Sequence, residues 1–383
     1  MKLHFSETLL ASEKAALASG IDKFADAITI VRDVSGRIRL IVEIKFGVAL
    51  EGLAECQRAK DELKLKLEDY FGGIEFLTIK ETRSDKIILD LIAKTRQKRE
   101  APPGSPCSQW YLLERRLSKN SWFEKQNPPW PLPTLQKPAP LIASFYSFKG
   151  GVGRTTALAA VAINLSRVGK RVVIIDLDLE APGLGSLMQG RTTYGALDYL
   201  FEHPVLGRAE TLDPYCSLQT EQKFILTGEA IRVIPAGVLN EEYIEKLSRL
   251  NFLTQQQDNG GSVASALSDL LIQCRDAFGA EYILLDARAG IHDIGGLALH
   301  GMSHVNILFG RASPQSYEGY SLILPELGRL NVQQGEDAPL CLPVHAFAPP
   351  AGDQNRETEI ENFRSTIYDL FVNNYYPSED DIP

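Results

Sequence analysis

The chain has 383 residues, 44% hydrophobic and 23% charged, a composition that excludes a disordered, collagen-like or disulfide-rich protein. No apolar run reaches the roughly 20 residues needed to span a bilayer, no secretory signal pattern opens the chain, and the five scattered cysteines form no CxxC pair. The net charge of −9 is uneven, because residues 1–140 carry 23 basic and 19 acidic side chains, whereas the remainder carries 17 and 30. These features predict a cytoplasmic protein of two or three domains that does not act at a membrane, with an acidic C-terminal part unsuited to a broad nucleic-acid interface.

The first 100 residues contain no proline and alternate between helical and strand patterns. The strand patterns are ADAITIVRD, IRLIVEIKF and IEFLTIK, and the first two are joined by VSGR, a hairpin signal. Helical patterns cover about residues 6–19, 49–70 and 84–99. We therefore expect a small α/β domain over residues 1–100.

Two carboxylates and a lysine stand on the first two strands of this domain. Asp26 opens one strand, and Glu43 and Lys45 lie near the end of the next, where alternation places them on one face. The opposite face should pack with Val42, Ile44 and Phe46. Carboxylates can bind Mg²⁺ and activate a water molecule, while a lysine stabilises charge on an attacked phosphate.

This order of elements and residues resembles the PD-(D/E)xK nucleases, whose fold is called restriction-endonuclease-like. The resemblance implies that Asp26 and Glu43 hold a metal ion and that Lys45 joins them in cleaving DNA or RNA. The pattern is short and frequent by chance, so two other hypotheses stay open. In the first of these, the domain is an inactive nuclease-like binding domain. In the second, it is an unrelated α/β module that binds a partner.

Residues 101–140 contain nine of the 21 prolines and all three tryptophans. Such a segment is typical of a stiff, partly extended connector. Its aromatic residues indicate that it docks on a domain.

Residues 141–383 alternate apolar strand patterns with helical stretches. The strand patterns are LIASFYSF, RVVIIDLD, YILLDA, VNILFG and LCLPVHAFA. Continuous Val, Ile and Leu runs separated by helices predict a doubly wound parallel sheet covered on both faces.

A glycine-rich loop follows the first of these strands and precedes a helix. Its residues are Lys149, Gly150, Gly151, Val152, Gly153, Arg154, Thr155 and Thr156. Glycines let successive backbone N–H groups converge on a phosphate, and the N-terminal end of the helix adds a positive dipole. The hydroxyl of Thr155 would stand where it can complete the coordination of a phosphate-bound Mg²⁺.

The loop and the strands after it resemble the deviant Walker A ATPases typified by ParA and MinD, a P-loop NTPase family. The resemblance implies that Lys149 reaches ATP in the opposite subunit of a sandwich homodimer. It further implies that Asp176 supports the Mg²⁺ shell, that Asp178 orients the attacking water and that Asp286 is the Walker B carboxylate.

Two residues depart from the family pattern. Arg154 stands where the family has its phosphate-gripping lysine, which keeps nucleotide binding plausible but puts efficient hydrolysis in question. Arg288 follows Asp286 in DARAG, where ParA and MinD proteins usually have DTPPG, and is either a charge that senses the nucleotide or a surface residue. No adenine-binding segment is identified.

These observations lead to three functional hypotheses. The first is an ATPase that dimerises around ATP and Mg²⁺ and controls an N-terminal nuclease, by resemblance in bacterial defence against phages or plasmids. The second is a switch that hardly hydrolyses ATP and docks an effector protein. The third, ranked lower, is an ATPase that partitions or positions cargo.

Overall fold

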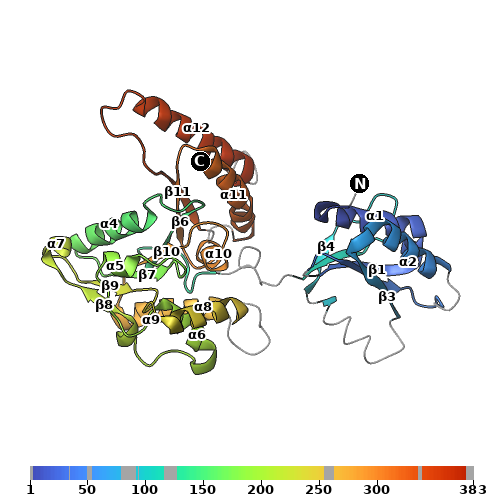
Figure 1. Cartoon of the computed structure of the whole chain (residues 1–383), viewed down its shortest axis with the longest axis horizontal. Helices are drawn as coiled ribbons and strands as arrows, with labels where there is room; N and C mark the ends of the chain where they lie inside the picture. Colours follow the sequence, from blue (N-terminus) through green and yellow to red (C-terminus); the bar gives the residue numbers. More distant parts are fainter. Residues whose placement is uncertain are drawn as a thin grey trace. The chain divides into compact units, whose positions relative to one another are not determined.

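The computed structural model describes residues 3–33, 35–49, 54–78, 92–93, 95–115, 127–253, 263–334 and 339–376. The chain divides into two compact units, Met1–Leu117 and Ser118–Pro383, which are drawn in Figure 1 and described here one at a time.

The described residues of the first unit form a five-stranded sheet and the helices α1 and α2. Its elements in chain order are η1 (Phe5–Glu7), α1 (Thr8–Ser19), η2 (Ile21–Phe24), β1 (Ala25–Arg32), β2 (Ile38–Ile44), α2 (Ala54–Leu67), η3 (Glu68–Tyr70), β3 (Phe71–Thr78), β4 (Gln97–Arg99) and β5 (Trp110–Glu114). The strand order is β3-β2-β1-β5-β4. β1 runs antiparallel to β2 and parallel to β5, so the predicted hairpin is confirmed.

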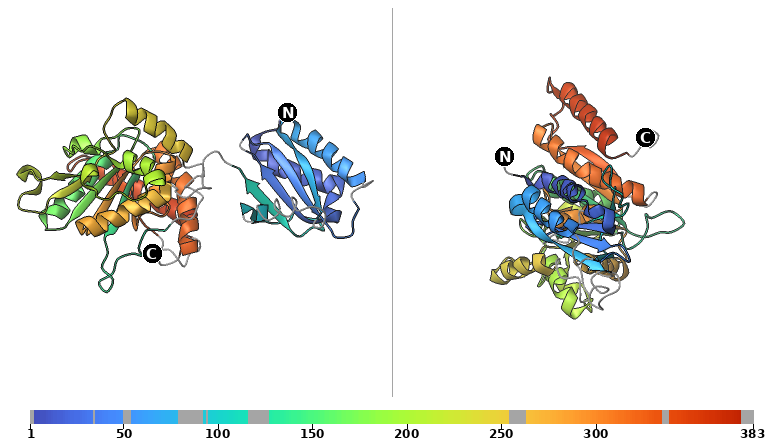
Figure 2. Two further views of the ribbon diagram at one scale, coloured as in Figure 1. Left: turned by 90° about the horizontal axis from the view of Figure 1, so that it is seen from below. Right: turned by 90° about the vertical axis from the view of Figure 1, so that its right-hand side faces the viewer.

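Both helices lie against the same face of this sheet, as the two views in Figure 2 also show. Small residues let α1 approach closely, since Ala15 and Ala16 are fully buried beside Leu63 of α2. The strands contribute alternate apolar residues to this core, namely Ile28, Ile30, Ile38, Leu40, Val42 and Ile44. Residues between these face the other side of the sheet, where Val31 and Ile41 belong to a second, smaller buried cluster. Phe46, expected on the face of Val42 and Ile44, is instead 74% exposed, because β2 ends at Ile44.

Two sequence expectations differ from the structure at the C-terminal side of this unit. The helix predicted over residues 84–99 lies largely outside the described residues, and Gln97–Arg99 form the edge strand β4 in place of a helical end. Residues 110–114, expected within a connector, form β5 beside β1. Gln97–Arg99 form a strand because they pair with β5. The helical periodicity of residues 84–99 could not predict this pairing, because the position of β5 depends on the tertiary structure.

Two of the three tryptophans are described, and each is buried in a different unit. Trp110 on β5 is fully buried in the first unit. Trp130 packs in the core of the second unit, and its indole N–H donates to the carbonyl of Pro140 at 2.7 Å. Both ends of the proline-rich segment are therefore anchored by an aromatic side chain.

The second unit is a seven-stranded sheet with helices on both faces. Its elements in chain order are β6 (Leu141–Ser147), α4 (Arg154–Arg167), β7 (Val172–Leu177), α5 (Leu184–Leu187), α6 (Ala196–Leu206), η4 (Asp213–Tyr215), β8 (Ser217–Gln219), α7 (Gln222–Ile225), β9 (Ile231–Ile234), α8 (Glu241–Leu253), α9 (Val263–Phe278), β10 (Tyr282–Ala287), α10 (Asp293–Leu299), β11 (Val305–Gly310), α11 (Pro314–Gln334), β12 (Leu340–His345) and α12 (Arg356–Asn374).

The strand order is β12-β11-β6-β10-β7-β9-β8, and only the short edge strand β8 is antiparallel to its neighbour. Successive residues of β7 enter different cores: Val173 and Ile175 pack with α6 and α9, whereas Val172 and Ile174 pack with α4. Figure 1 shows α4 and α9 on opposite sides of the sheet. The predicted doubly wound parallel sheet is confirmed, because strands buried on both faces read as continuous apolar runs.

This topology brings three loops to one edge of the sheet. β6, β10 and β7 are adjacent and parallel, with Asp286 paired in register to Phe145 on one side and Asp176 on the other. The loops that follow these strands therefore meet at their carboxyl ends, where ligands bind in open α/β sheets.

Candidate nucleotide-binding site

The loop between β6 and α4 has the backbone of an anion-binding turn. Gly151 and Gly153 have φ angles of +71° and +81°, a region that side-chain-bearing residues rarely adopt, and Gly153 is the N-cap of the 14-residue α4. Apart from each glycine's own neighbours in the chain, no described residue lies within 4 Å of the point where a Cβ would stand at Gly150, Gly151 or Gly153. The glycine loop therefore borders open space and leads into the N-terminus of α4, an arrangement that can bind a phosphate group.

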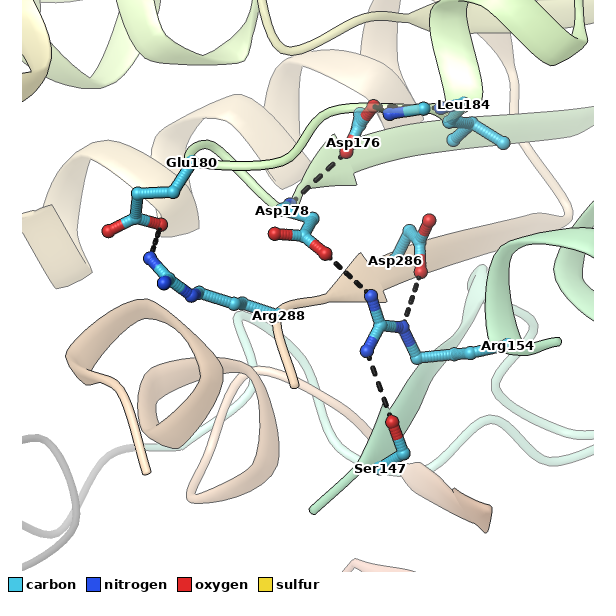
Figure 3. A network of polar contacts seen from close by, with 9 residues as sticks. Ser147, Arg154, Asp176, Asp178, Glu180, Leu184, Asp286 and Arg288 are labelled. Atoms are coloured by element: carbon cyan, nitrogen blue, oxygen red, sulfur yellow. Dashed lines mark hydrogen bonds and ion pairs between the residues drawn. The ribbon is translucent and has the colours of Figure 1, made fainter. Parts of the chain in front are cut away.

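Arg154 is the first residue of α4 and turns inward, to the carboxyl ends of β7 and β10 (Figure 3). Its Nε donates to Asp286 Oδ1 at 2.9 Å and its terminal nitrogens donate to Asp178 Oδ2 at 2.7 Å and Ser147 Oγ at 3.2 Å. The residue is only 7% exposed. A planar guanidinium can satisfy all three partners at once, which a single ammonium group cannot do with the same geometry.

The two carboxylates that bind Arg154 each keep one oxygen without a hydrogen bond. Asp178 Oδ1 and Asp286 Oδ2 are buried and have no hydrogen-bond partner within the described part of the chain. Burial raises the pKa of Asp286, while Arg154 and the hydroxyl of Thr155 oppose that rise. Buried oxygens of this kind are costly unless they have a cation or donor to contact.

Asp176 lies beside this pair and holds the loop after β7. Its Oδ1 accepts the backbone N–H of Asp178 at 3.1 Å, and its Oδ2 accepts those of Gly183 at 3.2 Å and Leu184 at 3.0 Å. Burial, together with the nearby charge of Asp286, raises the pKa of Asp176 to about 7, although these backbone hydrogen bonds lower it. Asp176 therefore fixes the position of Asp178.

Arg288 joins the same two loops through a second ion pair. Its guanidinium contacts Glu180, which also accepts from His292 Nε2 at 2.7 Å. Burial by itself raises the pKa of Glu180, but His292 and Arg288 hold that pKa below its ordinary value. The sequence left Arg288 as either a sensor or a surface residue, and the structure ties it to the loop that carries Asp178.

The structure thus gathers most residues that the sequence selected for this half of the chain. Arg154, Thr155, Asp176, Asp178 and Asp286 lie together at the carboxyl edge. Lys149 and Thr156 are exposed. Ser147, Glu180 and His292 were not selected from the sequence, because their partners are distant in sequence and no motif marks them.

Gly319 of α11 was also missed, and it supports the loop from behind. A Cβ at this position would stand 2.2 Å from Cγ of Phe148, the residue before Lys149. Only glycine leaves room for that ring, so α11 and the loop are packed directly against each other.

We expect Gly319→Ala to weaken nucleotide binding although alanine favours the helix by about 1 kcal/mol. The new methyl group must displace Phe148 and with it the start of the loop. Titration of a fluorescent nucleotide measures the effect. Ser321→Ala, exposed on the same helix, is the control for helix propensity. Equal affinity in both variants and the unsubstituted protein would show that Phe148 does not position the loop.

Of the three residues selected in the first unit, Glu43 and Lys45 contact different partners, and Asp26 is exposed. Glu43 forms an ion pair with Arg96, whose guanidinium also donates to Thr29 Oγ1 at 2.9 Å. Lys45 Nζ donates to the carbonyl of Lys23 at 2.8 Å, and Asp26 is exposed at an irregularity in the pairing of β1 with β2. Among the described residues, no three His, Cys, Asp or Glu side chains form a group able to hold a metal ion.

Residues 143–298 match the family model of the CobQ/CobB/MinD/ParA nucleotide-binding domain. This segment contains the glycine-rich loop and the three aspartates described above. Residues 143–298 are therefore a P-loop nucleotide-binding domain of the MinD/ParA type. No helix among the described residues has the length and apolar character needed to cross a membrane.

Curated relatives are similar to a part of the chain of about the same length as this segment. The septum site-determining protein MinD of Escherichia coli K12 is 30% identical over 156 residues, which are 40% of this chain and 47% of the relative. An uncharacterised ATP-binding protein of Methanocaldococcus jannaschii is 28% identical over 153 residues, 40% of this chain and 46% of that protein. The chain spans less than half of the length of the curated relatives that it matches.

Among solved structures, MinD of Pyrococcus horikoshii with Mg-ADP covers 58% of this chain and 76% of its own, at 16% identity and a TM-score of 0.39. Cobyrinic acid a,c-diamide synthase of Mycobacterium smegmatis with ADP and magnesium covers 59% and 82%, at 17% identity and a TM-score of 0.44.

Proposed function

We propose that the MinD/ParA-like domain binds ATP with Mg²⁺, hydrolyses it, and uses the change of nucleotide to control the N-terminal unit. The observation that carries this proposal is the open glycine loop at the N-terminus of α4, set beside the carboxylates of Asp178 and Asp286. The solved relatives with bound Mg-ADP and the E. coli MinD sequence support it.

The side chains present fit a magnesium ion that arrives with the nucleotide. Asp178 and Asp286 offer buried oxygens without hydrogen bonds, and the Thr155 hydroxyl lies against Asp286. Magnesium prefers such oxygen ligands and, when bound, would neutralise charge on the phosphates. Because no three His, Cys, Asp or Glu side chains of the described residues form a metal-binding group, phosphate and water would supply the other ligands of the ion. The part of Asp176 in that shell stays a prediction.

Within this proposal the chain's own residues have distinct tasks. The loop N–H groups from Gly150 to Thr156 bind phosphate, and Asp178 orients the water that attacks the terminal phosphate. Lys149, exposed on the loop, reaches the nucleotide of a second copy and closes an ATP-dependent homodimer. The ion pair between Glu180 and Arg288 links the loop that holds Asp178 to the loop after β10, so a movement of one loop on nucleotide binding is transmitted to the other.

We expect Thr155→Ala to lose the magnesium-dependent part of nucleotide affinity, about tenfold for one lost metal contact. A fluorescent ADP titrated in Mg²⁺ and again in EDTA measures it. Thr220→Ala, an exposed threonine of the same unit, is the control. If Thr155→Ala binds as tightly as the unsubstituted protein in Mg²⁺, the magnesium site is not where we place it.

For the N-terminal unit, the nuclease hypothesis stays a prediction beside the docking of an effector protein. A nuclease governed by ATP would suit defence against phages or plasmids. The ion pair of Glu43 with Arg96 and the hydrogen bond from Lys45 to the carbonyl of Lys23 favour docking, since a metal-dependent nuclease needs its carboxylates free and convergent.

A cleavage assay separates the two. The nuclease hypothesis predicts that the full chain cuts plasmid DNA or RNA in Mg²⁺ or Mn²⁺ and that an Asp26→Ala/Lys45→Ala variant does not. Lys60→Ala/Asp61→Ala, exposed on α2, is the matched control. The nuclease hypothesis is wrong if the Asp26→Ala/Lys45→Ala variant still cleaves, or if the unsubstituted chain does not cleave with or without ATP. Either result would favour the hypothesis that the N-terminal unit docks a partner protein.

The relatives also favour a positioning ATPase as a second candidate function. Several of them are septum site-determining proteins, and one solved relative is a plasmid partition protein of Borrelia burgdorferi. In that case the N-terminal unit binds the cargo. ATP-dependent, salt-sensitive retention on DNA by the full chain would identify the cargo as DNA.

A further inference from the structure

We propose that Arg154 is a built-in counter-ion for Asp178 and Asp286, and that a nucleotide must draw Arg154 onto its phosphates before a metal ion can bind these carboxylates. Metal binding is then ordered after nucleotide binding. This inference rests on the proposed function and concerns the regulation of that same site.

The first support is that every side-chain nitrogen of Arg154 donates a hydrogen bond in this structure. Nε and the two terminal nitrogens each donate to a different side chain, on β6, in the loop after β7 and on β10 (Figure 3). Asp178 and Asp286 are 24 and 132 residues away from Arg154 in the sequence, and the guanidinium bridges them. The side chain is thus an internal cation where a divalent ion is expected to act.

The second support is electrostatic. The residue is almost fully buried, so the charges interact with little screening by water. A divalent cation that approaches Asp178 or Asp286 meets the positive guanidinium on the same carboxylates and is repelled. No three acidic, His or Cys side chains in the described chain form a metal-binding group, so these carboxylates alone are a weak site.

The third support is that a phosphate offers Arg154 an equivalent set of acceptors. Arg154 begins α4 directly after Gly153, so its backbone belongs to the same turn that faces open space. Guanidinium groups bind phosphate through two parallel hydrogen bonds. When Arg154 moves to the nucleotide, both carboxylates lose their counter-ion and gain the capacity to hold a metal.

A lysine at this position would behave differently. Its ammonium is a point charge on a flexible stem and cannot bridge Ser147, Asp178 and Asp286 in one plane. Arg154→Lys therefore keeps the charge but releases part of the carboxylate pair. We expect this variant to bind metal in the absence of nucleotide.

The test uses Mn²⁺ as a paramagnetic probe, with the free ion measured by electron paramagnetic resonance on the full chain. The unsubstituted protein should bind Mn²⁺ weakly without nucleotide and much more tightly after ADP is added. Arg154→Lys should bind Mn²⁺ without nucleotide about tenfold more tightly than the unsubstituted protein does. Arg167→Lys, exposed at the end of the same helix, should resemble the unsubstituted protein.

Ser147→Ala is a second variant, which removes one of the three contacts of Arg154 without changing any charge. It tests the inference independently if Arg154→Lys fails to fold. It should shift nucleotide-free Mn²⁺ binding in the same direction by a smaller factor. Tight binding of Mn²⁺ to the unsubstituted protein without nucleotide overturns the inference. ADP binding in EDTA is measured in parallel: its absence, together with no binding in Mg²⁺, overturns the proposed function itself.

Discussion

Lys149→Ala is expected to abolish ATP-dependent dimerisation. Lys149 is exposed on the loop, and no ion pair involving it is formed among the described residues, so its charge is available to a second copy. In a sandwich dimer, loss of a lysine that contacts phosphate across the interface leaves that phosphate charge uncompensated. Sedimentation velocity in Mg²⁺ and a slowly hydrolysed ATP analogue measures the change.

The control for this variant is Lys137→Ala, an exposed lysine of the same unit outside the glycine loop. The control should dimerise as the unsubstituted chain does. A Lys149→Ala protein that still binds nucleotide but stays monomeric supports the proposed role. A dimer that persists in ATP would exclude Lys149 as a contact across the interface.

Asp178→Asn is expected to lower ATP turnover by a factor on the order of 10² to 10³, the usual range when a group that orients or activates water is lost. Nucleotide affinity measured in EDTA, where no metal ion is held by Asp178, should change little. The amide keeps an oxygen that can accept from Arg154, so the substitution preserves the shape of the network while it removes one charge.

Single-turnover hydrolysis with saturating ATP and Mg²⁺ measures this effect apart from binding. Asp213→Asn, an exposed aspartate of the same unit, is the matched control. Full turnover in Asp178→Asn would remove Asp178 from the reaction. If the unsubstituted chain and Asp178→Asn both turn over ATP only at the background rate, the domain is a binding switch that hardly hydrolyses ATP.

These two variants and the Mn²⁺ experiment address different steps of one cycle. Arg154 concerns the order in which nucleotide and metal arrive, Lys149 concerns closure of the dimer, and Asp178 concerns the chemical step. Each measurement has its own readout, so loss of one step can be distinguished from loss of nucleotide binding.

For the second unit, local sequence patterns were sufficient to predict the parallel sheet and to select residues that the structure places together at its carboxyl edge. Apolar runs long enough for a buried strand, separated by helical periodicity, favour a parallel sheet because its crossover helices cover both faces of such strands. Glycines at Gly151 and Gly153 determine a turn with positive φ angles, since the requirement is local to the backbone. Asp176 and Asp286 were found because each ends an apolar run.

Only the tertiary structure decided what those residues touch. The bridge from Arg154 to Asp178 and Asp286 depends on β10 lying between β6 and β7, an order that differs from the order along the chain. The contact between Gly319 and Phe148 likewise depends on how α11 packs. In the first unit, Glu43 pairs with Arg96 from a segment that helical periodicity had assigned to a helix. Ion pairs and close contacts between distant residues follow from strand order and packing, which no local pattern encodes.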